Sequence, residues 1–124
     1  MNIPIFKIGQ QVQFILPNTT VTAYGYIYHL RGLKAWIFDS NYKLYVIKLN
    51  NVYAGDFKSH NKHFINVVYE DMLYMVVFTE FMSRVYTSVI IDIKNTYRVN
   101  LKDDRDLYNK LNELATIKYN LGLN

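Results

Sequence analysis

Three tyrosines alternate with a glycine and an isoleucine in the segment Tyr24-Gly25-Tyr26-Ile27-Tyr28. Side chains along a β-strand point alternately to opposite faces, so the three phenol rings are expected on one face of a strand and Gly25 and Ile27 on the other. A glycine inside a strand is typical of a bulge or bend, which lets the strand curl around a small barrel. The segment therefore predicts a curled sheet with one tyrosine-rich face.

The first half of the chain alternates between strand-like segments and short polar turns. Strands are expected at residues 11–16, 20–30, 33–38 and 42–49. Four short strands at this spacing predict an antiparallel meander. With an entering strand at 8–12, a kinked strand at 24–26 and a closing strand at 44–47, the meander resembles an SH3-like small barrel over about the first 55 residues.

The second half is also rich in strand-forming residues. Residues 56–63 are polar and basic and predict a loop, and the segment 64–101 predicts further strands. The apolar run at 72–82 fits either a buried strand or a buried helix. Its neighbours are rich in Val, Ile, Tyr and Phe, which favours the strand.

The C-terminal segment 103–121 predicts one amphipathic helix. Asp103-Asp104 can cap its beginning, and Gly122 can end it in a left-handed conformation. Leucines recur at the helical spacing of one face, at Leu107, Leu111 and Leu114. The predicted fold class is α+β in a single domain of residues 1–124: mostly antiparallel β, with a small SH3-like, barrel-like meander first, further strands next and one C-terminal amphipathic helix last.

Motifs of catalysis and metal binding are missing from the sequence. Cysteine is absent, which excludes disulfides, thiolate metal sites and a cysteine nucleophile. The five glycines are scattered, so no phosphate-binding loop is expected. Zinc needs three or four convergent ligands, whereas only His60 and His63 are close in sequence. The prediction is a protein that is not an enzyme and has no metal or cofactor; a histidine-dependent enzyme is the alternative, and it would need one of these histidines beside a carboxylate in a cleft.

The cellular location of the protein is predicted from its apolar segments and its first residues. The densest apolar run, Met72 to Phe78, is much shorter than the roughly 20 residues of a membrane-spanning helix. The first residues lack the pattern of a secretory signal. A cytoplasmic protein with no membrane partner is therefore expected.

Positive charge is concentrated in the first half. Residues 1–65 hold seven Lys and Arg against two Asp, whereas residues 66–124 hold seven against eight Asp and Glu. A positive region attracts an acidic partner, such as nucleic acid or an acidic protein face. Solubility alone is the other explanation of the excess charge.

Aromatic and basic residues of the first half form the candidate binding surface. It consists of Tyr24, Tyr26, Tyr28, Arg31, Lys34, Trp36, Lys43 and Tyr45. The basic loop adds an electrostatic arm formed by Lys58, His60, Lys62 and His63. Aromatic rings that stack on bases, beside cations that neutralise phosphates, are typical of nucleic-acid binding on small barrels. The leading hypothesis is a non-catalytic module that recognises nucleic acid or a nucleoprotein. This hypothesis requires the tyrosine face to be exposed. The alternative interpretation is that the tyrosine face is buried under later parts of the chain.

A second hypothesis starts from the origin of the gene. Asn, Ile, Tyr and Lys account for 47 of the 124 residues, which indicates an AT-rich genome. A small, motif-free protein from such a source could be a phage or mobile-element accessory factor that binds and inhibits a host or defence protein. The same Tyr and Trp residues suit a protein interface.

Overall fold

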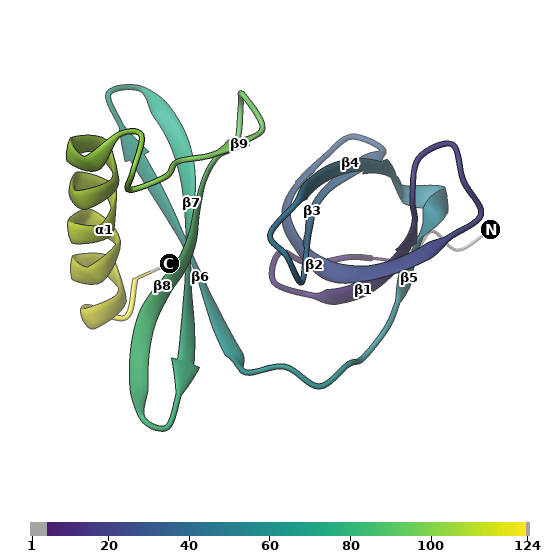
Figure 1. The fold of residues 1–124 in the computed structure, drawn as a ribbon, viewed down its shortest axis with the longest axis horizontal. Helices are drawn as coiled ribbons and strands as arrows, with labels where there is room; N and C mark the ends of the chain where they lie inside the picture. The colour runs from purple at the N-terminus through teal and green to yellow at the C-terminus, as the bar shows by residue number, and fades with distance from the viewer. Residues whose placement is uncertain (1–4, 124) are drawn as a thin grey trace. The chain divides into compact units, whose positions relative to one another are not determined.

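The computed structural model describes residues 5–123 and forms two compact units. The first unit ends at Lys58 and the second begins at Ser59. Both are antiparallel β-sheets, and the second also carries the helix, so the fold class is α+β as predicted (Figure 1). The boundary lies inside the segment 56–63 that the sequence predicts as a loop.

The first unit is a five-stranded antiparallel sheet with the order β4-β3-β2-β1-β5. Its elements are β1 (Gln11–Ile15), β2 (Thr22–Arg31), β3 (Lys34–Asp39), β4 (Leu44–Lys48), the 3-10 helix η1 (Leu49–Asn51) and β5 (Val52–Ala54). The predicted meander is confirmed, and β5 returns to pair with β1. The strands curl around a common centre (Figure 1), and β4 and β5 remain the two edges of the sheet.

One face of this sheet forms the core of the first unit. Directly opposite residues of an antiparallel pair share a face, and Ile27 of β2 pairs with Ile37 of β3. Both are fully buried, together with Val12 and Phe14 of β1. Ile27 therefore lies on the face opposite Tyr26, as the alternation along residues 24–28 predicts.

Gly25 allows β2 and β3 to approach closely. A Cβ atom at this position would lie 2.2 Å from the carbonyl oxygen of Phe38. The register is regular here, since Gly25 pairs with Asp39, and the bulge lies between Ile27 and His29 instead. Of the two expectations for this glycine, a bulge or a bend, the bulge is therefore wrong. The glycine is needed because a neighbouring backbone occupies the space of a side chain.

The second unit is a four-stranded antiparallel sheet covered on one face by a helix. Its elements are β6 (Asn61–Tyr69), β7 (Met72–Phe81), β8 (Arg84–Asp92), β9 (Tyr97–Arg98) and α1 (Arg105–Asn120), with the strand order β6-β7-β8-β9. The apolar run at 72–82 is a strand, as favoured. Two-residue turns with positive φ at both positions join β6 to β7 and β7 to β8, which is typical of tight hairpins.

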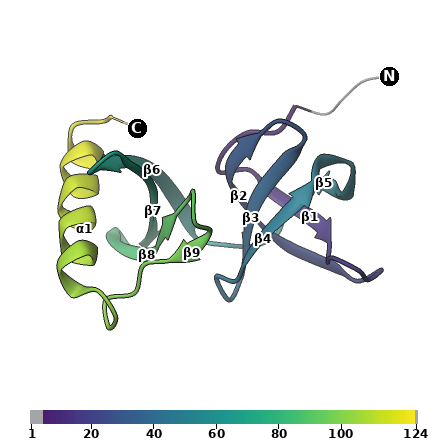
Figure 2. The ribbon, with the colours of Figure 1, turned by 90° about the horizontal axis from the view of Figure 1, so that it is seen from above.

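Helix α1 lies along the sheet of the second unit (Figure 2). The Asp104 carboxylate caps the helix by accepting a hydrogen bond from the backbone N–H of Leu107 at 3.3 Å. Leu111 and Ala115 are fully buried against strand residues that include Val76 and Ile90. The predicted helix over 103–121 is confirmed with slightly shorter bounds.

Candidate functional site

The three tyrosines of β2 do not form an exposed surface. Tyr24 is 50% exposed, but Tyr26 is only 7% exposed and Tyr28 is fully buried. The ring of Tyr26 stacks on Phe38 at 5.5 Å between centroids and meets Phe57 edge-on at 5.3 Å. The prediction of an outward phenol face is therefore wrong for Tyr26 and Tyr28. Aromatic residues distant in the sequence pack on this face, so both sides of β2 are buried at its centre.

Gln11 holds the segment after β5 against the tyrosines. Its side-chain amide donates a hydrogen bond to the Tyr26 hydroxyl at 3.1 Å. The amide oxygen of the same side chain accepts a bond from the backbone N–H of Phe57 at 2.9 Å. One glutamine therefore links β1, β2 and the chain around Phe57, which brings the Phe57 ring onto Tyr26 and Tyr24.

The Tyr28 hydroxyl is buried and has no hydrogen-bond partner in the part of the chain that the structure describes. Burial also raises the pKa of this phenol well above its usual value. An unpaired buried hydroxyl opposes folding, because it has lost its bonds to water.

The Tyr28→Phe variant tests this arrangement. We expect an unchanged free energy of unfolding, or an increase of up to about 1 kcal/mol, because only an unpaired polar atom is removed. Urea denaturation measures the change. Tyr26→Phe is the matched control and should lose about 1 kcal/mol, since it removes the bond to Gln11. A larger loss for Tyr28→Phe than for Tyr26→Phe would contradict this description.

Tyr45 and Lys43 lie apart from the other predicted surface residues. Trp36 pairs with Val46 of β4, whereas Tyr45 pairs with the buried Ile37, so Tyr45 and Trp36 are on opposite faces. The Tyr45 ring packs on Phe14 of the core, with 5.2 Å between centroids. The Lys43 ammonium lies 5.5 Å from the centroid of the Tyr45 ring. The prediction that these two residues share a surface with Trp36 is therefore wrong.

Asp39 explains the position of Tyr45 and Lys43. The Tyr45 hydroxyl donates a hydrogen bond to the Asp39 carboxylate at 3.2 Å, and the Lys43 backbone N–H donates another at 2.9 Å. Burial raises the pKa of Tyr45, and the negative charge and hydrogen bond of Asp39 add to the effect. Asp39 thus holds Lys43 in the turn between β3 and β4, and it also holds Tyr45 near the start of β4.

Three exposed cations form a row across β2, β3 and β4, which we call the cationic row: Arg31, Lys34 and Lys48. Arg31 pairs with Lys34, and Lys34 pairs with Lys48, so all three share one face. Within residues 5–123, none of them has an ion pair with a carboxylate. Like charges directly opposite one another repel. A row without counter-charges is therefore well suited to an anionic partner.

Arg31 and Lys34 were predicted surface residues, whereas Lys48 was missed. Its place in the row depends on the register between β3 and β4, which brings residues 34 and 48 together. The sequence offers one signal, since Lys48 is the next-to-last residue of the expected strand 42–49 and Lys34 is the second residue of the neighbouring expected strand 33–38. That signal does not distinguish one register from the next, and a shift by one residue would move Lys48 to the other face.

Trp36 and His29 lie beside the cationic row on the same face. They occupy paired positions on β3 and β2, and their rings meet edge-on at 4.9 Å between centroids. Both side chains are half-buried. Burial, and to a smaller degree the charge of Arg31, lowers the pKa of His29 below its usual value of 6.5. His29 is therefore neutral at pH 7, and the charge of this face comes from the row.

The predicted electrostatic arm is only partly a loop. Lys58 and His60 are exposed in the connecting segment, but Lys62 and His63 belong to strand β6. The Lys62 ammonium donates a hydrogen bond to the Thr79 hydroxyl at 3.0 Å, and the His63 imidazole lies 3.1 Å from the Glu80 carboxylate. The prediction of a loop through residue 63 is wrong because these side chains pair across β6 and β7.

The alternative function, a histidine-dependent enzyme, requires a histidine beside a carboxylate, and His63 has such a neighbour. Its imidazole lies beside the Tyr119 ring, at 5.0 Å between centroids, in addition to its contact with Glu80. Both members of the His63–Glu80 pair are about one-third exposed, at 32% and 38% of their side-chain surface. No group of three or more His, Asp and Glu in the described residues is placed to hold a metal ion. The pair links two strands at the surface of the sheet.

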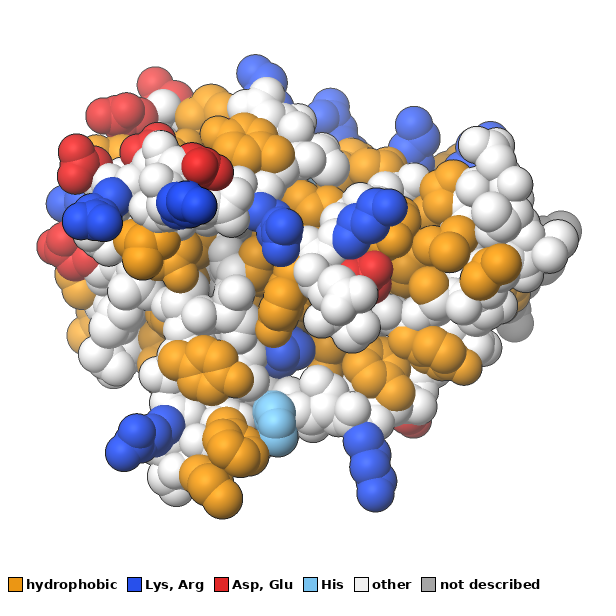
Figure 3. Space-filling model, viewed as in Figure 1, with side chains coloured by type: hydrophobic (Ala, Val, Ile, Leu, Met, Phe, Trp, Pro, Cys, Tyr) orange, Lys and Arg blue, Asp and Glu red, His pale blue; other side chains and the backbone are white. Residues whose placement is uncertain are grey.

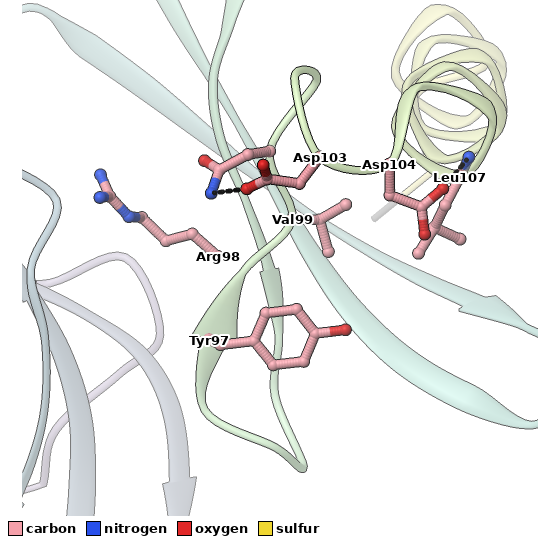
Figure 4. Close-up of a pocket in the computed structure, with 7 residues that line it drawn as sticks. Tyr97, Arg98, Val99, Asp103, Asp104 and Leu107 are labelled. Atoms are coloured by element: carbon pink, nitrogen blue, oxygen red, sulfur yellow. Dashed lines mark hydrogen bonds between the residues drawn. The ribbon is translucent and has the colours of Figure 1, made fainter.

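A shallow hollow in the second unit lies at the start of α1 (Figure 4). Arg98 points away from the two aspartates that line it (Figure 4). Asp103 accepts a hydrogen bond from the Asn100 side chain at 3.3 Å, and Asp104 caps the helix. Both carboxylates are thus engaged in local structure. This hollow offers no pair of groups arranged for acid–base chemistry.

The comparisons with known proteins identify no relative. No family model, no curated protein and no solved structure matches the chain significantly. None of the helices in the described residues is sufficiently long and apolar for a membrane span.

Proposed function

We propose that the chain is a non-catalytic module whose first unit binds nucleic acid, either free or within a nucleoprotein. The observation that carries the proposal is the cationic row, an exposed line of three positive charges without carboxylate partners among residues 5–123. Such side chains bind phosphates by releasing counter-ions from the nucleic acid. Trp36 beside the row adds an aromatic edge for contact with a base.

The distribution of charge between the two units agrees with this proposal. The first unit holds six Lys and Arg against two Asp, a net charge of +4, whereas the second holds eight against eight. Figure 3 shows Asp and Glu side chains gathered over the second unit, where α1 begins. A polyanion is therefore attracted to the first unit and not to the second.

The spacing of the row suits consecutive phosphates. Neighbouring strands lie about 4.8 Å apart, so a row across three strands extends over about 10 Å. A nucleic-acid strand carries one charge per about 3.4 Å along a helix axis. The row therefore has the length to contact up to three phosphates of one strand.

The salt dependence of binding tests the proposal. The ligand is a fluorescein-labelled single-stranded oligonucleotide of about ten nucleotides, and fluorescence anisotropy measures its affinity for the whole chain. Three neutralised phosphates predict that log Kd rises with log salt with a slope of about 2, or about 20-fold weaker binding between about 50 and 200 mM salt. A flat response, or no binding at the lowest salt, would contradict the proposal.

A protein partner is the second candidate function, and it is favoured by the tip of the β7–β8 hairpin. Large apolar side chains are exposed there, namely Phe81, Met82, Val85 and Tyr86. Figure 3 shows the hydrophobic side chains gathered at this end of the hairpin. Exposed apolar clusters of this kind are typical of protein contacts. Nuclease treatment separates the candidates, because a protein bound at the tip stays associated and a nucleic acid does not.

A further inference from the structure

A hollow of about 420 Å³ lies beside the cationic row in the first unit. Its walls come from the loop between β1 and β2, from β4 and from η1. Lys48 lines the hollow and is also the last residue of the row. Val46, which pairs with Trp36, lines it next to Lys48. The row and the hollow are therefore continuous along strand β4.

Two side-chain amides in this hollow are free to bind a ligand. Asn18 and Asn51 both line it, and neither side chain has a hydrogen-bond partner within the described chain. Thr19, by contrast, is engaged, since its hydroxyl donates to the Leu16 carbonyl at 2.9 Å and accepts from the Val21 N–H at 3.1 Å. The free polar groups of the hollow are thus two amides and one ammonium, beside the apolar surface of Val46.

We propose that this hollow receives one unpaired base of the strand whose phosphates lie on the cationic row; this inference rests on the proposed function. Asparagine amides match the paired donors and acceptors on the edge of a base. The volume is within the range of small-ligand sites, which begins at about 300 Å³. A base can enter only when it is unstacked and unpaired, so the ligand is a single strand or a loop and not a regular duplex.

The test separates the contribution of the bases to binding from the contribution of the phosphates. Anisotropy measures binding of three labelled homopolymers (A, C and T) and of an abasic oligonucleotide of the same length and charge. We expect at least one homopolymer to bind the wild-type protein about tenfold more tightly than the abasic strand does, because a stacked or hydrogen-bonded base adds this much. The salt slope should be the same for both ligands, since both have the same phosphates.

The variant Asn18→Gly/Asn51→Ala then tests whether the preference for a homopolymer over the abasic strand arises in the hollow. Asn18 has a φ of 61°, a left-handed conformation that glycine adopts without strain, so the loop is expected to keep its shape. We expect the preference for bases to fall to about twofold or less, with the affinity for the abasic strand unchanged. Asn51→Ala alone should lose part of the preference. Thermal unfolding confirms that each variant is folded.

The possible outcomes distinguish this inference from the proposed function. If the wild-type protein binds the abasic strand as tightly as every homopolymer, the inference is wrong and the phosphate-binding proposal stands. If the folded double variant keeps the full preference, the base lies elsewhere and the inference is also wrong. If the wild-type protein binds none of the strands, both are wrong.

Discussion

The Gly25→Ala variant is expected to lose about 3 kcal/mol or more of the free energy of unfolding of the first unit. The added Cβ would lie 2.2 Å from the Phe38 carbonyl oxygen and 2.9 Å from a methyl group of Ile37. A backbone carbonyl cannot move aside as a flexible side chain does. The strands β2 and β3 must therefore separate locally, which disturbs the pairing that holds Phe38 on Tyr26.

Urea denaturation followed by the fluorescence of Trp36 measures this loss, because Trp36 is the only tryptophan in the chain and belongs to the first unit. Gly32→Ala is the matched control. Gly32 has free space around its Cβ position but a φ of 59°, so its replacement should cost only about 1 kcal/mol. Equal stabilities of the Gly25 and Gly32 variants would show that β2 and β3 are not closely apposed.

Removing the three charges of the cationic row is expected to weaken binding of the oligonucleotide by between about tenfold and 100-fold at low salt. The variant is Arg31→Ala/Lys34→Ala/Lys48→Ala. Its stability should be unchanged or slightly higher, because the three exposed side chains have no ion pairs in the described chain and repel one another. A loss of binding without a loss of stability separates a contact with the ligand from an effect on folding.

The matched control for the row is Arg84→Ala/Lys94→Ala/Lys102→Ala. It removes the same types and number of charges from exposed positions of the second unit. We expect a change in affinity of about threefold or less, because these residues affect the ligand only through the overall charge. Equal losses in the two variants would show that net charge, and not the row, determines binding.

Local patterns in the sequence predicted the elements of the fold. Alternation along β2 placed Ile27 on the face opposite Tyr26, and Ile27 is buried in the core. The aspartate cap and the spaced leucines located α1, and Leu111 packs on the sheet as expected. These features depend on residues a few positions apart, so a single sequence contains them.

The candidate site depended on pairings between distant segments, and here the prediction failed in part. Alternation correctly places Tyr26 and Tyr28 opposite Ile27, but it does not show that Phe38 and Phe57 cover the tyrosines. The bulge after Ile27 is equally invisible in the sequence, although it determines which residues of β3 face His29.

The proposed binding surface therefore consists of cations and not of the tyrosines. Arg31, Lys34 and Trp36 remain from the predicted set, since they share the exposed end of one face of β2 and β3. Tyr45 leaves it because the register of β4 turns its ring to the core, and the same register adds Lys48. Strand register, which a single sequence determines only weakly, accounts for both changes.

The slope of log Kd against log salt for the row variant tests the central claim most directly. Each phosphate contact that is lost removes about 0.7 from the slope for a single strand, so the three substitutions should lower it by about 2, to nearly zero. The control variant in the second unit should keep the wild-type slope. An unchanged slope in the row variant would mean that Arg31, Lys34 and Lys48 do not touch phosphates, which would contradict the proposed function.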